Sequence, residues 1–299
     1  MAYRNVIVES PAALSVRRSQ LVIRTGEEHS VPIEDVSVLL IENNQTTITA
    51  AALSLLGQSG CTVFFCDGKH MPCACLTPFM QHSRNTAVIR QQIEIAEPLR
   101  KQLWKSIVIA KIGNQAACLK QLGREDEAAS IRALAARVRS GDADNTEATA
   151  AARYFRFLFG RTFTRGEESA VNAALNYGYA IVRGCVARQL AAYGFLPALG
   201  VHHRSELNAF NLADDLMEPF RPLIDLLVSV SLEGQAEFST DAKRQLVNAL
   251  NLDLISGGQR HSAAYAIERA VQSLSRSLAD GAPELVLPEL CELKQHSYE

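Results

Sequence analysis

The chain has 299 residues, a formal net charge of −2 and 47% hydrophobic residues. This length is enough for two domains that each bury a core. The near-zero net charge excludes a protein that is basic over its whole surface. No stretch approaches the roughly 20 apolar residues of a membrane-spanning helix, and residues 1–16 lack the apolar centre of a signal peptide. We therefore expect a cytoplasmic protein that does not associate with membranes.

The first 78 residues predict a small β-rich domain. Short β-branched and apolar runs predict its strands, at residues 6–8, 21–24, 29–32, 36–41 and 61–66. The second and third of these strands flank a Thr-Gly-Glu-Glu turn, which is typical of a hairpin. One helix is expected at residues 49–58, where Gly57 and Gly60 mark its end. Short strands with open edges and no cluster of catalytic side chains favour a dimerisation or docking role for this domain.

The seven cysteines are odd in number, and four of them lie close together, at Cys61, Cys66, Cys73 and Cys75. A zinc site is expected to repeat a matched pair of cysteines, and this sequence has one Cys-x-Cys without a second. We interpret the cysteines as free thiols in a reducing cytoplasm.

Residues 79–84 predict a linker, and residues 85–299 predict a larger helical domain. Apolar residues recur there at the 3.6-residue spacing of amphipathic helices. The expected helices span residues 87–96, 99–112, 116–140, 146–155, 171–183, 212–217, 223–232, 241–250 and 265–278. Pro283 and Pro288 are expected to end regular structure, which leaves a polar tail. The fold class is therefore α+β, with a β-rich N-terminal domain and an all-helical catalytic domain.

The charge is unevenly distributed along the chain. Residues 76–139 contain 11 Lys and Arg against 5 Asp and Glu. A basic stripe of this kind can bind the phosphate backbone of DNA, and Arg132, Arg137 and Arg139 lie at its end. A solvated helix face gives the same pattern, so the charge alone leaves both interpretations open.

Side chains able to do chemistry concentrate in residues 200–225, which include two His, five Asp or Glu and two Arg. Asp215 and Glu218 are three residues apart, so they share a face of the predicted helix, and Asp214 lies close to that face. His203 precedes them across a polar loop and can fold back onto a helical carboxylate. Imidazole and carboxylate ligands together suit Mg²⁺ or Mn²⁺ better than they suit a closed zinc site.

The same window resembles the C-terminal signature of the CRISPR-associated integrases, the endonuclease-like subunits that insert new spacers into CRISPR arrays. The family pattern is a Gly-hydrophobic-hydrophobic-His turn, followed by a helix reading Asp-Leu-hydrophobic-acid-x-Phe-Arg-Pro. This sequence reads Gly-Val-His-His at residues 200–203 and Asp-Leu-Met-Glu-Pro-Phe-Arg-Pro at residues 215–222. The His-His-Arg, Asn-Ala-Phe-Asn-Leu and Glu-Pro-Phe-Arg-Pro forms are similar to the type II branch, and the resemblance extends over nearly the whole chain.

The resemblance implies a catalytic centre in which Glu147, His203 and Glu218 bind one divalent ion, Mg²⁺ or Mn²⁺. Glu147 opens a Glu-x-x-x-Ala-Ala-x-Tyr-Phe pattern that is similar to the family's. On sequence alone, an acid in a first helical turn is more readily explained by capping and the helix dipole, with residues 144–146 as the expected caps. The side chains expected to support the ligands are Asp214, Asp215, Asn176, Tyr177 and Arg221. Arg221 is expected to form an ion pair with the carboxylates.

DNA contacts are expected from basic and imidazole side chains, namely Arg132, Arg137, Arg139, Arg161, Arg165, His202 and Arg204. The resemblance further implies that the 3′-hydroxyl of an incoming DNA fragment attacks a phosphodiester of the array, so the protein need not supply a nucleophile. It implies a prokaryotic protein whose partners are double-stranded DNA (spacer fragment and CRISPR array), a second copy of the chain, a small ferredoxin-like CRISPR-associated subunit in a heterohexamer, and other type II CRISPR proteins. Two alternatives stay open: a stand-alone metal-dependent nuclease on branched DNA, and a non-catalytic DNA-binding scaffold.

Overall fold

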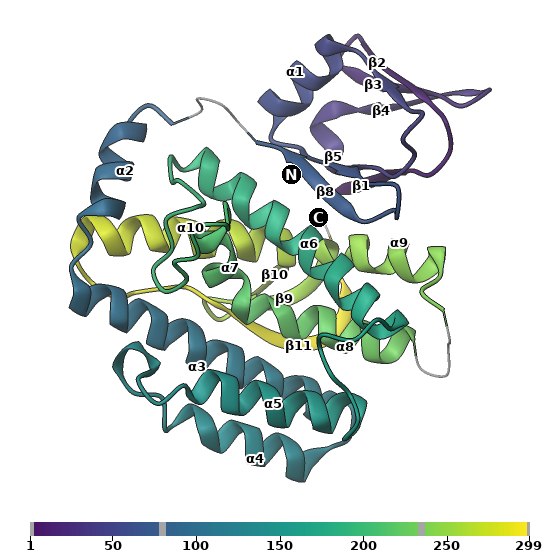
Figure 1. The fold of residues 1–299 in the computed structure, drawn as a ribbon. Helices are drawn as coiled ribbons and strands as arrows, with labels where there is room; N and C mark the ends of the chain where they lie inside the picture. The colour runs from purple at the N-terminus through teal and green to yellow at the C-terminus, as the bar shows by residue number, and fades with distance from the viewer. Residues whose placement is uncertain (1–2, 78–81, 233–236, 298–299) are drawn as a thin grey trace. The chain divides into compact units, whose positions relative to one another are not determined.

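In the computed structural model the chain divides into two compact units, residues 1–79 and 80–297. The structure describes residues 3–77, 82–232 and 237–297 (Figure 1). The division falls within the predicted linker, residues 79–84, of which residues 79–81 lie outside the described residues. Each unit has buried apolar side chains of its own. The α+β fold class, with a β-rich N-terminal region and a mainly helical remainder, is confirmed.

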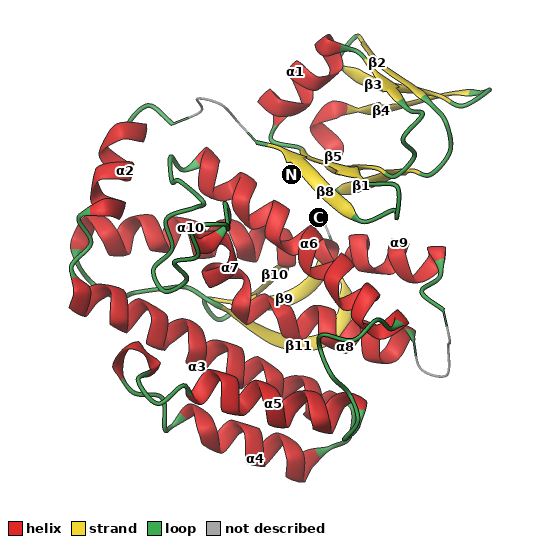
Figure 2. Cartoon of the chain, in the orientation of Figure 1, coloured by secondary structure: helices red, strands yellow, loops and turns green. Residues whose placement is uncertain are grey.

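One sheet of the N-terminal unit is built around a buried central strand (Figure 2). Its strands β1 (Arg4–Val8), β5 (Val36–Ile41) and β7 (Thr62–Cys66) are parallel, and β8 (Pro72–Leu76) pairs antiparallel with β7. β5 lies between β1 and β7, and five of its six residues are buried. A strand covered on both faces has a continuous apolar run, which is how residues 36–41 read in the sequence.

The second sheet of this unit contains the predicted hairpin. β3 (Gln20–Arg24) and β4 (Glu28–Pro32) are antiparallel, and Gly26 between them has a φ of +104°, which favours glycine. β2 (Ala13–Arg17) pairs with β3, and β6 (Thr47–Ile48) completes the sheet. The helix predicted at residues 49–58 is confirmed as α1 (Ala50–Ser59). The apolar core of the unit includes Leu14, Leu21, Leu39, Leu56 and Val63.

The C-terminal unit is mainly helical. Its helices are α2 (Asn85–Ile93), α3 (Glu97–Gln121), α4 (Glu125–Ala135), α5 (Thr146–Phe159), α6 (Ala170–Ala192), α7 (Asn211–Met217), α8 (Arg221–Ser231), α9 (Thr240–Asn248) and α10 (Ala263–Asp280). α6 contacts α7, α8, α9 and α10, and α3 contacts α4, α5 and α8. A Cβ on Gly178 of α6 would lie 2.4 Å from Ile224 Cγ2 of α8, so the glycine allows these two helices to approach closely. None of the described helices combines the length and apolar character needed to cross a lipid bilayer.

The helix predicted at residues 116–140 is wrong as a single element. α3 runs on to Gln121, and Gly123, with a φ of +73°, turns the chain before α4 begins at Glu125. The Ala-rich composition of this stretch favours helix throughout, and the glycine that follows α3 supplies the left-handed conformation of a helix end.

The expectation of an irregular tail after Pro288 is also wrong. β11 (Pro288–Gln295) pairs with β9 (Leu252–Ser256), which pairs on its other side with β10 (Gln259–Ser262). The unit expected to be all-helical therefore contains a three-stranded sheet. Asn114 of α3 anchors the new strand, because its side chain donates to the Pro288 carbonyl at 2.9 Å and accepts from the Leu290 N–H at 2.9 Å. An anchor this distant in the chain leaves no local sequence pattern.

Candidate active site

The ammonium group of Lys111 lies between two carboxylates. Its Nζ is 2.5 Å from Glu147 Oε1 and 2.5 Å from Glu218 Oε2. α3 supplies the lysine, the first turn of α5 supplies Glu147, and the short helix η3 (Glu218–Phe220) supplies Glu218. Glu147 Oε1 and Glu218 Oε2 can therefore be no further apart than twice the 2.5 Å that separates each of them from the lysine nitrogen. The fold brings together two predicted metal ligands that are far apart in the sequence.

Asp142, just before α5, holds the first turn of that helix. Its carboxylate accepts hydrogen bonds from the backbone N–H groups of Thr146 at 2.9 Å and Glu147 at 3.0 Å. Asn145, at the N-cap position, makes no capping hydrogen bond through its side chain. The cap expected within residues 144–146 is therefore wrong, and Asp142 from the preceding turn takes that role. Through this cap the buried Asp142 positions Glu147, whose side chain is 25% exposed.

Asp215 holds the turn that carries His203. Its carboxylate accepts the backbone N–H groups of His202 at 2.9 Å and His203 at 3.1 Å, and it lies 2.6 Å from His203 Nδ1. The Asp215 side chain is completely buried. Because Nδ1 is engaged with this carboxylate, Nε2 is the ring nitrogen that remains for a metal or a substrate.

Gly200 allows this turn to close. A Cβ at this position would lie 2.4 Å from the carbonyl oxygen of His203 and 2.7 Å from Asp215 Oδ2. The first contact is with backbone, which cannot yield without moving the turn. This close approach is the physical reason for the glycine in the Gly-Val-His-His segment.

Burial and ion pairing act against each other at the two central charges. Burial alone would raise the pKa of Glu218, but the Arg221 guanidinium and the Lys111 ammonium outweigh it and lower that pKa to about 2. Burial alone would lower the pKa of Lys111, but Glu218 and Glu147 raise it above its ordinary value. Both groups are therefore charged at neutral pH. The pKa of His203 is raised, mainly by its hydrogen bond to Asp215.

Arg221 forms the expected ion pair with Glu218. Its Nε lies 2.8 Å from Glu218 Oε1, whereas Lys111 contacts the other oxygen. The guanidinium carbon is 4.5 Å from the centroid of the Tyr179 ring, and the Tyr179 hydroxyl hydrogen-bonds to Asp225. Burial raises the pKa of Asp225 to about 6. These contacts fix Glu218 against α6 and α8 on the side away from Lys111.

Two of the predicted supporting residues have other partners. Asn176 is exposed and accepts a hydrogen bond from Arg165 Nη2 at 2.8 Å. Arg165 also hydrogen-bonds to Asn172, so this predicted DNA contact is committed to the start of α6. Tyr177 is buried, and its ring contacts Phe238 edge-on with centroids 5.5 Å apart. The tyrosine beside the ion pair of the site is Tyr179, two residues further along α6.

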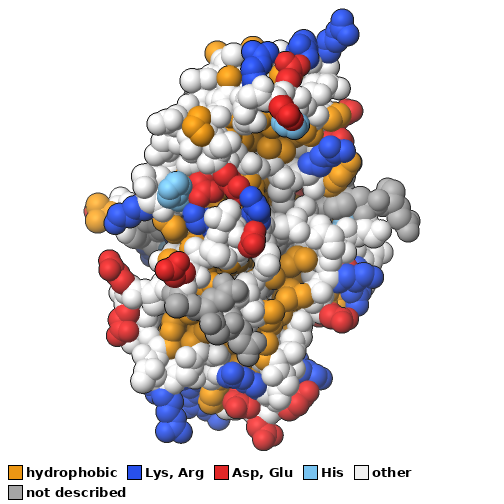
Figure 3. Space-filling model, turned by 90° about the vertical axis from the view of Figure 1, so that its right-hand side faces the viewer, with side chains coloured by type: hydrophobic (Ala, Val, Ile, Leu, Met, Phe, Trp, Pro, Cys, Tyr) orange, Lys and Arg blue, Asp and Glu red, His pale blue; other side chains and the backbone are white. Residues whose placement is uncertain are grey.

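The other predicted DNA-contacting residues differ in exposure and pairing. Arg132, Arg137 and Arg161 are exposed. Arg139 and Arg204 are also exposed, but they form ion pairs, with Asp144 and Glu97 respectively. His202 stacks on Trp104, with ring centroids 4.0 Å apart and planes 2° from parallel. On the face of the molecule in Figure 3, Lys and Arg side chains alternate with acidic and neutral ones.

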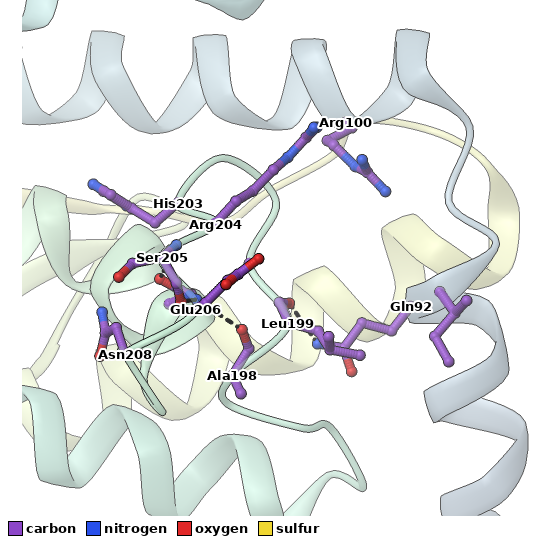
Figure 4. Close-up of a pocket in the computed structure, with 12 residues that line it drawn as sticks. Gln92, Arg100, Ala198, Leu199, His203, Arg204, Ser205, Glu206 and Asn208 are labelled. Carbon is purple, nitrogen blue, oxygen red and sulfur yellow. Dashed lines mark hydrogen bonds between the residues drawn. The ribbon is translucent and has the colours of Figure 1, made fainter.

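A pocket of about 500 Å³ opens beside His203. Figure 4 shows Arg100 of α3 and Arg204 of the His203 turn lining it, together with Gln92 and Asn208. The Gln92 amide binds the Leu196 and Leu199 carbonyls and so holds the loop before Gly200. Asn208 donates to Asp214, a predicted supporting residue, which also pairs with Arg183 at 2.7 Å. The pocket thus joins an imidazole and two guanidinium groups to one carboxylate, Glu206. The two guanidinium groups suit a phosphate-bearing ligand.

The sequence-based interpretation missed Lys111 and Asp142, and it did not include the buried Trp104, which stacks on His202. Lys111 did leave a signal, since it is a single charge within an apolar stretch of α3, and a buried lysine needs a partner. Asp142 left none, because it caps from outside the helix through a turn in which its own φ is +51°.

The side chains of the site offer the donor types of a divalent cation site, but a lysine stands between two of them. Among the described residues, no three His, Cys, Asp or Glu side chains are grouped so that they could hold a metal ion as they stand. Lys111 occupies the space between the two carboxylates instead. The chemistry of the donors nevertheless fits Mg²⁺ or Mn²⁺: two converging carboxylates, and an imidazole oriented through Nδ1 by a third carboxylate, that of Asp215. The assignment of Glu147, His203 and Glu218 as ligands stays a prediction.

Comparisons with known proteins identify the family of this chain. Residues 6–251 match the family described as CRISPR associated protein Cas1. A CRISPR-associated endonuclease Cas1 of Neisseria meningitidis serogroup C (strain 8013) is 46% identical over 304 residues, covering 100% of both chains.

Two solved structures share the fold. A casposase bound to integration product aligns with a TM-score of 0.76 at 19% identity, over 95% of this chain and 92% of the casposase chain. A chain of a partial Cas6-RT-Cas1–Cas2 complex aligns with a TM-score of 0.64 at 17% identity, over 96% of this chain and 99% of that chain. Since the family match spans most of the sequence and the Neisseria relative is similar from end to end, the chain belongs to the Cas1 family of CRISPR-associated proteins.

Proposed function

We propose that this protein is a divalent-metal-dependent DNA integrase and endonuclease that inserts new spacer DNA into a CRISPR array. The observation that carries the proposal is the convergence of Glu147 and Glu218 on one cationic position. The imidazole of His203, whose Nδ1 is held by Asp215, interacts electrostatically with Glu218. Membership of the Cas1 family and the endonuclease name of the Neisseria relative agree with it.

In this proposal Glu147, His203 and Glu218 hold Mg²⁺ or Mn²⁺. The bound ion would polarise a phosphodiester and offset charge that develops on its oxygens. Asp215 keeps the His203 ring in one orientation, and Arg221 does the same for the Glu218 carboxylate.

The DNA strand would lie along the pocket beside His203. Arg100 and Arg204 line that pocket, and their guanidinium groups match the geometry of phosphate oxygens. Both arginines also lie near Glu97, at 3.5 Å and 3.8 Å, so this acid holds them together in the absence of DNA. The Arg204–Glu97 pair is exposed and therefore weak, so Arg204 can exchange Glu97 for a phosphate.

The attacking group would come from the DNA. The two carboxylates of the site are committed to cations, and Asp215 is committed to His203, so these groups are poorly placed to activate water. The 3′-hydroxyl of a bound spacer fragment would instead benefit from its proximity to the target phosphodiester. The reaction is then a transesterification, in which the array strand is joined to the fragment and its own 3′-hydroxyl leaves.

The proposed partners are double-stranded DNA, as spacer fragment and as array, and a second copy of this chain. A small ferredoxin-like CRISPR-associated subunit would join them in a heterohexamer, and other type II CRISPR proteins would cooperate. The shared fold with a chain of a Cas1–Cas2 complex is consistent with the small partner. We place the protein in the cytoplasm, where the array is found.

A labelled DNA fragment and a supercoiled plasmid that carries an array distinguish an integrase from a nuclease. The purified protein, its small partner subunit and Mn²⁺ should transfer label to the plasmid when the fragment ends in a 3′-hydroxyl. A 3′-dideoxy end should abolish the transfer. Equal plasmid nicking with both kinds of end, and no label transferred, would mean that water is the nucleophile and that the protein is a stand-alone nuclease. DNA binding with neither label transfer nor plasmid nicking would favour the non-catalytic DNA-binding scaffold.

The ligand assignment predicts the effect of three Ala substitutions. Glu147→Ala, His203→Ala and Glu218→Ala should each lower strand transfer by roughly a thousandfold or more, since metal catalysis supplies several kcal/mol of stabilisation. Calorimetric titration should find Mn²⁺ binding weakened in each. Glu168→Ala, at an exposed position before α6, is the matched control and should change neither. Unchanged Mn²⁺ affinity in all three variants would remove the assignment.

A further inference from the structure

Lys111 is a buried positive charge that takes no part in the proposed reaction. Its side chain is 9% exposed, and its ammonium contacts one oxygen from each of two carboxylates. The four central charges balance: Lys111 and Arg221 are positive, whereas Glu147 and Glu218 are negative. Among these four side chains, charge is balanced by protein groups alone.

We propose that Lys111 is an internal counter-ion that competes with the divalent metal for Glu147 and Glu218. Without a metal, its ammonium neutralises the two carboxylates, and a metal reaches them by displacing it. The inference rests on the proposed function, since it takes these carboxylates to be metal ligands.

Leaving the two carboxylates without a cation would be costly. The Glu218 side chain is only 7% exposed. Its Oε2 and Glu147 Oε1 each lie 2.5 Å from the same ammonium nitrogen, so the two carboxylates are close together. Two negative charges so close, one of them buried, repel each other and lose hydration. A protein that must fold before it meets its metal needs a positive charge here, and Lys111 supplies it.

Lys111, and not Arg221, is the cation that a metal can displace. Arg221 is held from two sides, by Glu218 Oε1 at 2.8 Å and by the face of the Tyr179 ring. A guanidinium fork in such a setting is rigidly placed, whereas a lysine ammonium is a compact charge on a flexible four-carbon chain. The lysine contacts Glu218 through Oε2, the oxygen that Arg221 leaves for another cation.

Competition between the ammonium and the metal fixes the direction in which Lys111 changes metal affinity. If the ammonium holds both carboxylates in the metal-free protein, then only the fraction of molecules in which it has moved away can bind a metal. The apparent dissociation constant is raised by the inverse of that fraction. Removing the ammonium should therefore tighten metal binding, whereas removing a group that merely supports the site should weaken it.

Calorimetric titration of Mn²⁺ into the wild-type protein and Lys111→Met tests this sign. We expect the variant to bind Mn²⁺ roughly tenfold or more tightly. Its melting temperature without metal should fall below that of the wild type, and saturating Mn²⁺ should raise it by more than it raises the wild type. Lys120→Met, an exposed lysine near the end of the same helix, is the matched control and should leave both quantities unchanged. Equal or weaker Mn²⁺ binding by Lys111→Met would overturn the proposal.

The double variant Lys111→Met/Glu147→Gln separates this inference from the ligand assignment. It removes one charge of each sign, so without metal it should melt at a higher temperature than Lys111→Met alone, and it covers the case in which the single variant does not fold. No recovery in the double variant would also overturn the counter-ion role. A third outcome is that neither the wild type nor Lys111→Met binds Mn²⁺, while the double variant regains melting temperature. The ligand assignment and the competition with metal would then both be wrong. The role of Lys111 in neutralising the two carboxylates would stand.

Discussion

At the scale of single residues, the position of His203 depends on two neighbours, Asp215 and Gly200. Asp215 binds both the imidazole and the backbone of the turn, and Gly200 leaves room for that carboxylate. The sequence pattern identifies His203 as a functional residue, but the geometry is set by its neighbours. A change at either neighbour should therefore act on metal binding through His203.

Gly200→Ala tests this dependence. The added Cβ would lie 2.4 Å from the His203 carbonyl oxygen, so the turn must shift and carry the imidazole with it. We expect Mn²⁺ affinity and strand transfer to fall roughly 10- to 100-fold, the range found when groups that orient a metal ligand are lost. Gly166→Ala is the control, because a Cβ there meets nothing within 4 Å. Wild-type metal affinity in Gly200→Ala would mean that the turn adapts.

At the scale of elements, the first turn of α5 is held from outside the helix by Asp142. Asp142→Ala removes the acceptor of two backbone N–H groups and should lower the free energy of unfolding by about 1–2 kcal/mol. The first turn carries Glu147, so Mn²⁺ affinity should fall as well. Urea denaturation and calorimetry measure the two effects.

Asp144→Ala is the matched control for that substitution. Asp144 lies two residues closer to α5, but it is exposed and pairs with Arg139. A surface ion pair is worth only about 0–1 kcal/mol, so this variant should resemble the wild type in stability and in Mn²⁺ affinity. A larger loss in Asp144→Ala than in Asp142→Ala would restore the cap predicted from the sequence.

The contact between α6 and α8 predicts a pH dependence of stability. Asp225 is buried against Tyr179, and burial raises its pKa from 3.8 to about 6. Between these two values the folded protein keeps the proton while the unfolded chain loses it, so the wild type loses stability as the pH rises. The side chain at this position in Asp225→Asn cannot ionise. The free energy of unfolding of this variant, relative to that of the wild type, should therefore rise by up to about 3 kcal/mol between pH 4 and pH 7.

Urea denaturation at pH 4.5 and pH 7.5 measures this difference. Asp241→Asn serves as the control, because Asp241 is 83% exposed and its substitution should give the same small effect at both pH values. If the stability difference between Asp225→Asn and the wild type is also the same at both pH values, the Asp225 carboxyl is not held protonated in the folded protein.

At the scale of the whole molecule, the sequence predicts what depends on local periodicity and misses what depends on distant contacts. The strand at residues 36–41 and the hairpin around Gly26 follow from apolar runs and turn chemistry, and the structure has both. β11 does not follow, because the side chain of Asn114, far earlier in the chain, anchors it. The site divides in the same way. Glu147 and Glu218 appear in motifs, whereas Lys111 becomes part of the site only when α3 packs against α5 and η3.

The structure shows that the arginines at the end of the basic stretch, residues 76–139, differ in their pairing. Arg132 and Arg137 are exposed near the end of α4, whereas Arg139 is already paired with Asp144. An arginine that binds a phosphate releases counter-ions from DNA, and each such contact contributes about 0.9 to the slope of log affinity against log salt. An arginine with a carboxylate partner must first give up that partner, so it should contribute less.

The double substitution Arg132→Gln/Arg137→Gln should therefore weaken binding to double-stranded DNA at all sequences and lower the salt slope by about 2. Arg139→Gln should lower it by less than 1, because Asp144 offsets the charge that is removed. Arg244→Gln, an exposed arginine on α9 that is likewise paired with an acid, is the control and should leave the slope unchanged. Fluorescence anisotropy with a labelled duplex, titrated between low and physiological salt, gives all four slopes. A double variant with the wild-type slope would show that this end of α4 is a solvated helix face, and that the DNA follows other arginines, beginning with Arg100 and Arg204 beside His203.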